Sequence, residues 1–306
     1  MDELDKDMNG WCGLMRRAAR GHRPVSAGGE VALLALALLL AACGRPEPMG
    51  PGAAPPQWRA LFPGIQECSV TIHGAQALRV HALKIDLRHP GLKFVVTPPP
   101  SGGGAMVRSM RVSTFVERFH CLVAINATPF GPEVDREGRP QVVSGLAAAD
   151  GKVYARPPNN TWGVLLIGRD NGARIATPPV DLAKVWNAVG GFGLLLKDGV
   201  NVGAKDARYP RTAVGLSRDG RWMYWLVIDG HQPNFSIGAS TWTTARWLQW
   251  LGAWQGLNLD GGGSSTLVVA DGKEGPVVLN CPINSGIPGT QRPVAVCLGV
   301  TEDTAR

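Results

Sequence analysis

The sequence predicts a single α+β domain built on a curved, largely antiparallel sheet with few helices. Three observations support this fold class. Apolar and polar residues alternate along many short runs, which is typical of half-buried strands. Asp-Gly pairs at 150–151, 198–199, 219–220 and 271–272 lie near or between apolar runs, as hairpin turns do. The helical segments are too few for repeated βαβ units, so antiparallel pairing is expected.

The strands are expected first at residues 67–73 and 78–87, where two alternating runs flank a turn at Gly74-Ala75. The clearest hairpin joins residues 213–216 to 222–228 across the Asp219-Gly220 turn. Because two-residue turns of this kind connect neighbouring antiparallel strands, both pairs should lie side by side in one sheet.

Two segments are expected to be helical. Residues 113–120 begin at Ser113, a residue type that caps helix starts, and carry apolar side chains at 115, 116 and 119. Residues 241–250 follow a second candidate cap, Ser240, and end before Gly252. The tryptophans in and after this second segment fall on several faces, which favours core packing over a binding surface.

The amino terminus indicates export. Four arginines between residues 16 and 23 precede a twelve-residue apolar run, 31–42, which is too short to span a bilayer comfortably and has the layout of a secretory signal. The run ends in Leu40-Ala41-Ala42-Cys43, which resembles a bacterial lipobox. We therefore expect residues 1–42 to be removed and Cys43 to carry a lipid anchor in the cell envelope. Gly44 resembles the pattern for sorting to the outer membrane in a Gram-negative cell.

The remainder divides into a tether and a domain. Residues 43–63 are rich in Pro, Gly and Ala, a composition that buries little apolar surface and so favours an extended linker. Residues 64–306 are long enough for one domain with its own core. The formal net charge of +7 is scattered. It suits an anionic substrate or surface and lacks the dense basic runs of a nucleic-acid-binding protein.

The cysteine content predicts disulfide bonding in an exported chain. Besides Cys12 and Cys43, four cysteines remain, and an even number in an oxidising compartment favours at least one disulfide. Three pairings of the four are open. Zinc is the alternative, but no close Cys or His spacing supports it. The four are Cys68, Cys121, Cys281 and Cys297.

The most informative stretch runs from Asn258 to Thr266. Asp260 ends an apolar segment and is followed by Gly261, Gly262 and Gly263. Glycines are used where no side chain fits or where backbone N–H groups must approach a ligand. A capping turn is the alternative reading. Together with the hydroxyls of Ser264 and Ser265, the string predicts a functional site.

This string resembles the signature of the phosphodiester glycosidase family. Other segments agree with that family in the same order along the chain, from about residue 68 to residue 300. They are Gly190–Gly199, Pro210-Arg211-Thr212-Ala213-Val214-Gly215, Val227-Ile228-Asp229-Gly230, Asn280-Cys281-Pro282 and Arg292-Pro293-Val294. The chain departs from the family at Asn126-Ala127-Thr128-Pro129-Phe130, where NGGFF is common. It also lacks an acid in the helical segment before the signature.

The resemblance implies hydrolysis of a sugar-1-phosphodiester or a related glycosidic bond in envelope glycans. Asp229 and Asp260 would act as the paired carboxylates of a glycosidase. Arg211 and Arg292 would bind phosphate oxygens through their guanidinium groups. The substrate would also be contacted by the side chains of Asn126, Asn258, Ser264 and Ser265 and by the N–H groups of the glycine run. His231, which follows Asp229-Gly230, would contact it as well.

Two other functions fit the same features. The chain could be a different polysaccharide or peptidoglycan hydrolase on this scaffold, or a glycan-binding lipoprotein without catalysis, since one fold hosts many chemistries. No cofactor is expected. The carboxylates leave room for a divalent metal, although no ligand spacing demands one.

Overall fold

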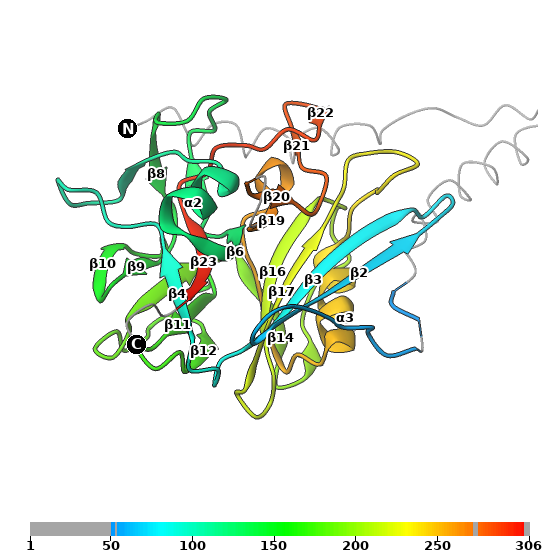
Figure 1. Cartoon of the computed structure of the whole chain (residues 1–306), viewed down its shortest axis with the longest axis horizontal. Helices are drawn as coiled ribbons and strands as arrows, with labels where there is room; N and C mark the ends of the chain where they lie inside the picture. The colour runs from blue at the N-terminus through cyan, green and yellow to red at the C-terminus, as the bar shows by residue number, and fades with distance from the viewer. Residues whose placement is uncertain (1–49, 53, 272–274, 303–306) are drawn as a thin grey trace, which may run out of the picture. The chain divides into compact units, whose positions relative to one another are not determined.

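The computed structural model describes residues 50–52, 54–271 and 275–302. The predicted leader, residues 1–42, and the predicted lipid site, Cys43, lie outside these ranges. Among the described residues there are only two α-helices and the sheets are antiparallel, so the α+β expectation holds in its coarse form (Figure 1).

An eight-stranded sheet carries most of the site. Its strand order is β1-β2-β3-β17-β16-β18-β14-β15. Every adjacent pair in it is antiparallel. The bounds are β1 Arg59–Phe62, β2 Ile65–Ile72, β3 Leu78–Asp86, β14 Gly193–Lys197, β15 Val200–Asn201, β16 Arg211–Leu216, β17 Trp222–Ile228 and β18 Gln255–Asn258. Both predicted hairpins, β2–β3 and β16–β17, are therefore confirmed.

Two five-stranded sheets and two small ones complete the fold. One is ordered β20-β19-β6-β23-β4 and the other β10-β9-β13-β11-β12; the small ones are β5-β8-β7 and β21-β22. The bounds are β4 Leu92–Val96, β5 Met106–Arg108, β6 Cys121–Asn126, β7 Phe130–Gly131, β8 Pro140–Val143, β9 Ala147–Ala149, β10 Lys152–Ala155, β11 Val164–Ile167, β12 Ala173–Ala176, β13 Asn187–Gly190, β19 Leu267–Val269, β20 Val277–Val278, β21 Ile283–Asn284, β22 Ile287–Pro288 and β23 Cys297–Glu302.

Both faces of the eight-stranded sheet are covered. Trp225 on β17 is fully buried in a cluster that also holds Val123 of β6 and Leu165 of β11. Its neighbour Leu226 points to the other face and packs with Trp247 of helix α3. This alternation explains why β17 is apolar at nearly every position, since a strand buried on both faces needs no polar side.

Helix α3, Thr241–Leu251, forms where local signals predict it. Ser240 accepts a hydrogen bond from the Thr243 N–H, and Gly252 ends the helix with a φ of 105°, a conformation that favours glycine. Helix α2, Val112–Phe119, begins one residue earlier than expected. Its N-cap is Arg111 without a side-chain cap, because the Ser113 hydroxyl instead accepts a hydrogen bond from Gln291 Nε2 at 3.0 Å.

The predicted disulfide is wrong for the described cysteines, which are all free thiols. The strand register explains part of this. Cys297 on β23 lies opposite Asn126 of β6, whereas Cys121 lies opposite Thr301. Cys121 and Cys297 are therefore offset by about four residues along the paired strands. At roughly 3.3 Å per residue, this offset places their Cα atoms farther apart than the roughly 7 Å that a disulfide allows. Cys68 belongs to β2 in another sheet, and the Cys281 thiol contacts Gln232 Oε1 at 3.3 Å.

The end of the predicted tether belongs to the folded unit. Residues 59–62 of the expected 43–63 linker form β1 and pair with β2. The Trp58 ring lies 6.2 Å from that of Tyr224, and the Trp250 indole donates to the Ala54 carbonyl at 2.7 Å. A composition rich in Pro and Ala hides these contacts, because Trp58 anchors the segment through one aromatic side chain. None of the described helices is long and apolar enough to cross a bilayer.

Candidate active site

Asp260 lies two residues beyond β18, and its backbone is held from several sides. Its N–H donates to the Ala127 carbonyl at 2.9 Å. Its carbonyl accepts from Asn126 Nδ2 at 2.7 Å. The Asn126 oxygen in turn accepts from Thr212 Oγ1 at 2.7 Å and from the Thr266 N–H at 3.1 Å. Asn126 was predicted to bind sugar hydroxyls, but its amide group instead makes hydrogen bonds within the protein that hold the Asp260 backbone in place.

Each glycine of the run after Asp260 is required for a different reason. A Cβ on Gly261 would lie 2.9 Å from the Pro210 carbonyl oxygen. Gly262 has a φ of 59°, in the left-handed region that favours glycine. A Cβ on Gly263 would collide with the Arg292 guanidinium. Because these residues lack side chains, the chain can pass close to both the Pro210 carbonyl and the Arg292 guanidinium. The sequence predicted such a close approach.

The glycine run opens onto a pocket of about 510 Å³, called here the acidic pocket. Asp260, Gly261, Gly262, Gly263 and Arg292 line it, as does His231, so six predicted site residues come together. Glu133, Tyr209, Ser285, Gly286 and Ile283 complete the wall. Glu133 and Tyr209 come from loops distant in sequence, whereas Ile283, Ser285 and Gly286 belong to β21 and the turn after it. A partly apolar wall with a few converging polar groups is typical of a small-ligand site.

Arg292 forms an ion pair with Glu133 in the acidic pocket, and its charge also acts on Asp260. Its Nη1 contacts Glu133 Oε1 at 2.6 Å, and its Nε donates to Asn284 Oδ1 at 2.9 Å. The Arg292 side chain is 14% exposed and that of Glu133 is 66% exposed. The guanidinium is therefore anchored from one side, and Glu133 stays accessible to solvent and to a ligand.

Burial raises the pKa of Asp260 from 3.8 to about 6. The Ser264 side chain, the Arg292 charge and the Gly261 N–H oppose this rise, and the Glu133 charge adds to it. A carboxyl group with a pKa close to neutrality can hold a proton and deliver it, as a general acid must. The acidic pocket thus contains two carboxyl groups in unlike environments, one half-buried at Asp260 and one exposed at Glu133.

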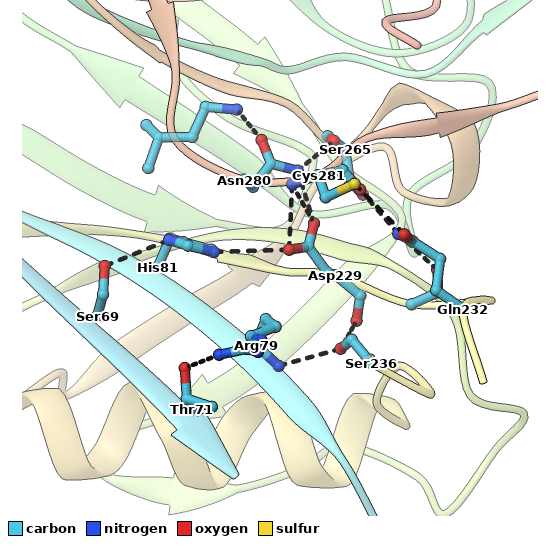
Figure 2. Close-up of polar contacts among 12 residues, drawn as sticks. Ser69, Thr71, Arg79, His81, Asp229, Gln232, Ser236, Ser265, Asn280 and Cys281 are labelled. Atoms are coloured by element: carbon cyan, nitrogen blue, oxygen red, sulfur yellow. Dashed lines mark hydrogen bonds and ion pairs between the residues drawn. The ribbon is translucent and has the colours of Figure 1, made fainter. Parts of the chain in front are cut away.

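Asp229 lies outside the lining of the acidic pocket, and Figure 2 shows the side chains that surround it. It is 1% exposed and is not among the residues that line the acidic pocket. Its carboxylate accepts from Asn280 Nδ2 at 2.9 Å and from the Cys281 N–H at 3.0 and 3.1 Å. His81 Nε2 lies 3.5 Å away. Every oxygen of the side chain is engaged by protein groups, so Asp229 joins the end of β17 to the segment after β20.

That segment also forms a wall of the acidic pocket. Cys281 is held a second time, because Gln232 Nε2 donates to its carbonyl at 2.9 Å. Ile283 and Ser285, just beyond it, line the pocket, and Asn284 between them supports Arg292. The Asp229 contacts therefore act on the pocket through this wall.

Arg211 and Asn258 line a different pocket. Arg211 donates from Nε to the Ala239 carbonyl at 2.9 Å and from Nη2 to the Ala207 carbonyl at 2.9 Å and to Asp206 Oδ1 at 3.2 Å. Burial lowers its pKa, and the Asp206 and Tyr209 charges oppose that effect. Ser264 and Ser265 are 0% and 1% exposed, and neither lines the acidic pocket.

The sequence did not single out Glu133, Tyr209 or Ser285. Each lies on a loop without a distinctive local pattern, and only long-range folding brings it to the pocket. The Glu133-Val134-Asp135 run after Pro132 was the one available signal, since two acids there follow the NATPF segment. In the described part of the chain, no cluster of three or more His, Cys, Asp or Glu side chains is placed to hold a metal ion.

Comparison with known proteins now identifies the family. The model of the phosphodiester glycosidase family matches residues 119–301, more than half of the chain and both carboxylates of the acidic pocket. The chain belongs to the phosphodiester glycosidase family. Membership makes it a glycosidase-type hydrolase that acts on phosphodiester-linked sugars. A search of curated proteins found no match.

Solved structures share the fold of this phosphodiester glycosidase at low sequence identity. One is the zebrafish N-acetylglucosamine-1-phosphodiester alpha-N-acetylglucosaminidase catalytic domain, auto-inhibited by its pro-peptide. It is 19% identical with a TM-score of 0.61, over 83% of this chain and 91% of that one. A Burkholderia pseudomallei K96243 protein is 16% identical with a TM-score of 0.53, over 74% of both chains. A Synechocystis protein is 16% identical with a TM-score of 0.51, over 81% of this chain and 64% of that one.

Proposed function

We propose that this phosphodiester glycosidase is exported, anchored by lipid at Cys43, and hydrolyses a sugar-1-phosphodiester in envelope glycans. The observation that carries the catalytic part is the acidic pocket, where Asp260 with its raised pKa, exposed Glu133 and Arg292 meet beside the glycine run. The leader and the Leu40-Ala41-Ala42-Cys43 sequence support the anchor.

The reaction cleaves the bond between the anomeric carbon and a phosphate oxygen. Asp260 donates its proton to the departing phosphate oxygen as the sugar develops oxocarbenium character. Arg292 stabilises the phosphate charge. Water supplies the hydroxyl at the anomeric carbon, and its proton passes to Glu133 if the displacement is direct. In this proposal Glu133 replaces Asp229 as the second carboxylate, and Asp229 positions the wall that carries Asn284.

Product analysis tests the function. The purified protein is incubated with UDP-N-acetylglucosamine and, separately, with isolated envelope polymers. Release of free N-acetylglucosamine from either supports the proposal. Asp260→Asn serves as the matched control, because it keeps the shape of the side chain and removes its proton. Binding of these substrates without any turnover would favour a glycan-binding protein instead.

Mass spectrometry of the mature amino terminus tests the anchor. We expect a diacylated or triacylated Cys43 as the first residue, and Cys43→Ser should abolish the modification and leave the chain unanchored. An unmodified amino terminus that begins after residue 43 in the native host would contradict this part alone, without bearing on the reaction.

A further inference from the structure

A second pocket of about 490 Å³ lies beside β14, β18 and the start of α3. We call it the aromatic pocket. The lining residues used in the argument below are Phe192, Gly193, Asp206, Arg211, Thr241 and Asn258. It is not used by the reaction proposed above. Its volume is in the range of small-ligand sites, and it combines one aromatic ring with several planar polar groups.

The ring of Phe192 is displayed in a fixed position. Its side chain is 43% exposed, and the Trp162 ring packs against it edge-on, with centroids 5.0 Å apart and an angle of 61°. The Phe192 N–H donates to the Asn258 carbonyl at 2.9 Å. A side chain on the preceding Gly191 would collide with the same carbonyl. The backbone and Trp162 therefore hold an exposed aromatic ring that a flexible loop would otherwise fold away.

The polar groups of the aromatic pocket are nearly neutral in sum. Arg211 Nη2 and Asp206 Oδ1 are 3.2 Å apart and offset each other's charge. Asp206 is itself oriented by the Thr241 N–H at 2.7 Å and the Thr241 hydroxyl at 3.1 Å. Asn258 is 5% exposed, and its buried Oδ1 has no partner among the described residues. An unsatisfied buried oxygen of this kind costs free energy until a donor reaches it.

These features favour an uncharged sugar ring over an anion. The C–H edges of a pyranose carry partial positive charge and suit the negative face of Phe192, which repels anions. Sugar hydroxyls can donate to Asp206, whose side chain is 39% exposed, and can accept from Arg211. A phosphate would gain little, because Asp206 already balances the Arg211 charge.

The aromatic pocket adjoins the acidic pocket through Tyr209. The Tyr209 ring lines the acidic pocket and lies 5.2 Å from the His231 ring. The same ring lies 5.4 Å from the Arg211 guanidinium of the aromatic pocket. We propose that the aromatic pocket binds a neutral pyranose unit of the glycan substrate. That the substrate is a glycan rests on the proposed function. That the bound unit is a neutral pyranose rests on the residues of the aromatic pocket.

An occlusion variant tests this inference. A Cβ added to Gly193 meets no atom within 4 Å, and Gly193 lines the pocket, so Gly193→Leu should fill it without disturbing the fold. Gly102→Leu is the matched control, since a Cβ there also meets nothing within 4 Å and Gly102 lies outside the aromatic pocket. Phe192→Ala removes the ring as a second, independent variant. Thermal melting verifies that each variant is folded.

Ligand-observed NMR titration measures binding of two probes that carry no phosphate, maltotriose and N,N′-diacetylchitobiose. We expect a dissociation constant of about 1 mM for at least one probe. It should weaken at least about tenfold in Gly193→Leu and in Phe192→Ala and stay unchanged in Gly102→Leu. Binding of neither probe to the wild type, or equal binding to folded Gly193→Leu, would overturn the inference. Inorganic phosphate that binds and is lost in Gly193→Leu, without sugar binding, would also overturn it by making this an anion site.

Turnover of UDP-N-acetylglucosamine is followed on the same proteins. If the wild type binds sugar, Gly193→Leu does not, and no protein turns over, the inference about the aromatic pocket holds and the proposed function fails. If the wild type turns over but Gly193→Leu binds sugar equally well, the proposed function holds and the inference fails.

Discussion

At the scale of single residues, the pKa of Asp260 makes a prediction about pH. Burial favours the neutral carboxyl, so its pKa rises from 3.8 to about 6. The stabilisation from this group is fully present below pH 3.8 and is lost as the pH rises through about 6. Turnover that needs protonated Asp260 should also fall above about pH 6. Initial rates from pH 4 to 8 measure the activity limb, and a rate that keeps rising past pH 7 would contradict the acid role.

Asp260→Asn should abolish turnover and remove this pH dependence of stability. The melting temperature of the variant relative to the wild type should therefore increase between pH 4 and pH 7, because only the wild type buries a growing charge. Circular dichroism melts at each pH give the difference. A variant that folds and turns over at the parent rate would return Asp260 to the role of a loop cap.

Gly263→Ala should impair catalysis through its neighbour. The added methyl group collides with the Arg292 guanidinium, which must swing away from Glu133 and Asn284 to accommodate it. We expect a loss of at least about tenfold in kcat/KM, the equivalent of one misplaced charged contact, with little change in melting temperature. Steady-state kinetics of Gly263→Ala beside Gly102→Ala provide the comparison. Equal activity of the two variants would place Arg292 outside the reaction.

At the scale of elements, the segment after β20 depends on Asp229. Asp229→Ala leaves the Cys281 N–H without an acceptor and Asn280 Nδ2 with only the Ser265 carbonyl, which should cost about 1–3 kcal/mol of unfolding free energy. Urea denaturation measures the loss, with Glu117→Ala as the control, because the Glu117 side chain is exposed on helix α2 and Ala is a good helix former. Asp229→Asn should retain folding and the pH limb of Asp260 but raise KM. A catalytic Asp229 would instead lose kcat and leave KM unchanged.

Element prediction succeeded where the signals are local. The Ser240 cap and the Gly252 stop of α3 lie within or next to the helix itself, and the β16–β17 hairpin needs only its own turn. The start of α2 was missed because Gln291, 178 residues away, takes the Ser113 hydroxyl. β1 was missed although its partner β2 follows it directly in sequence, because the Pro- and Ala-rich composition of residues 43–63 favours a linker over a strand.

At the scale of the whole molecule, sequence order and spatial order differ. β18 lies between β16 and β14, and β6 lies between β19 and β23; no periodicity in the sequence specifies either arrangement. The ordered motifs predicted the half of the acidic pocket that contains Asp260, Gly261–Gly263 and Arg292. Glu133 and Tyr209 come from loops placed by that topology, and the burial of Asp229 follows from contacts made across it.

The same topology separates the cysteines. We expect all four thiols of Cys68, Cys121, Cys281 and Cys297 to react when the chain is denatured without reductant. Burial raises the pKa of Cys121 to about 12 and that of Cys297 well above its usual value. In the native chain these two should therefore react slowly. Thiol counting with and without denaturant measures both states. Fewer than four thiols after denaturation would restore a disulfide.

The place of Tyr209 has a consequence for how two ligands interact. One ring forms part of the acidic pocket and contacts the Arg211 guanidinium of the aromatic pocket, and it is 45% exposed. A ligand that immobilises the ring from one side lowers the entropy that a ligand on the other side must remove. We therefore expect occupancy of the two pockets to be positively cooperative, and such a coupling is reciprocal. A glycan chain bound beside the scissile bond would then increase the enzyme's affinity for the phosphate. The phosphate would increase its affinity for the glycan chain by the same factor.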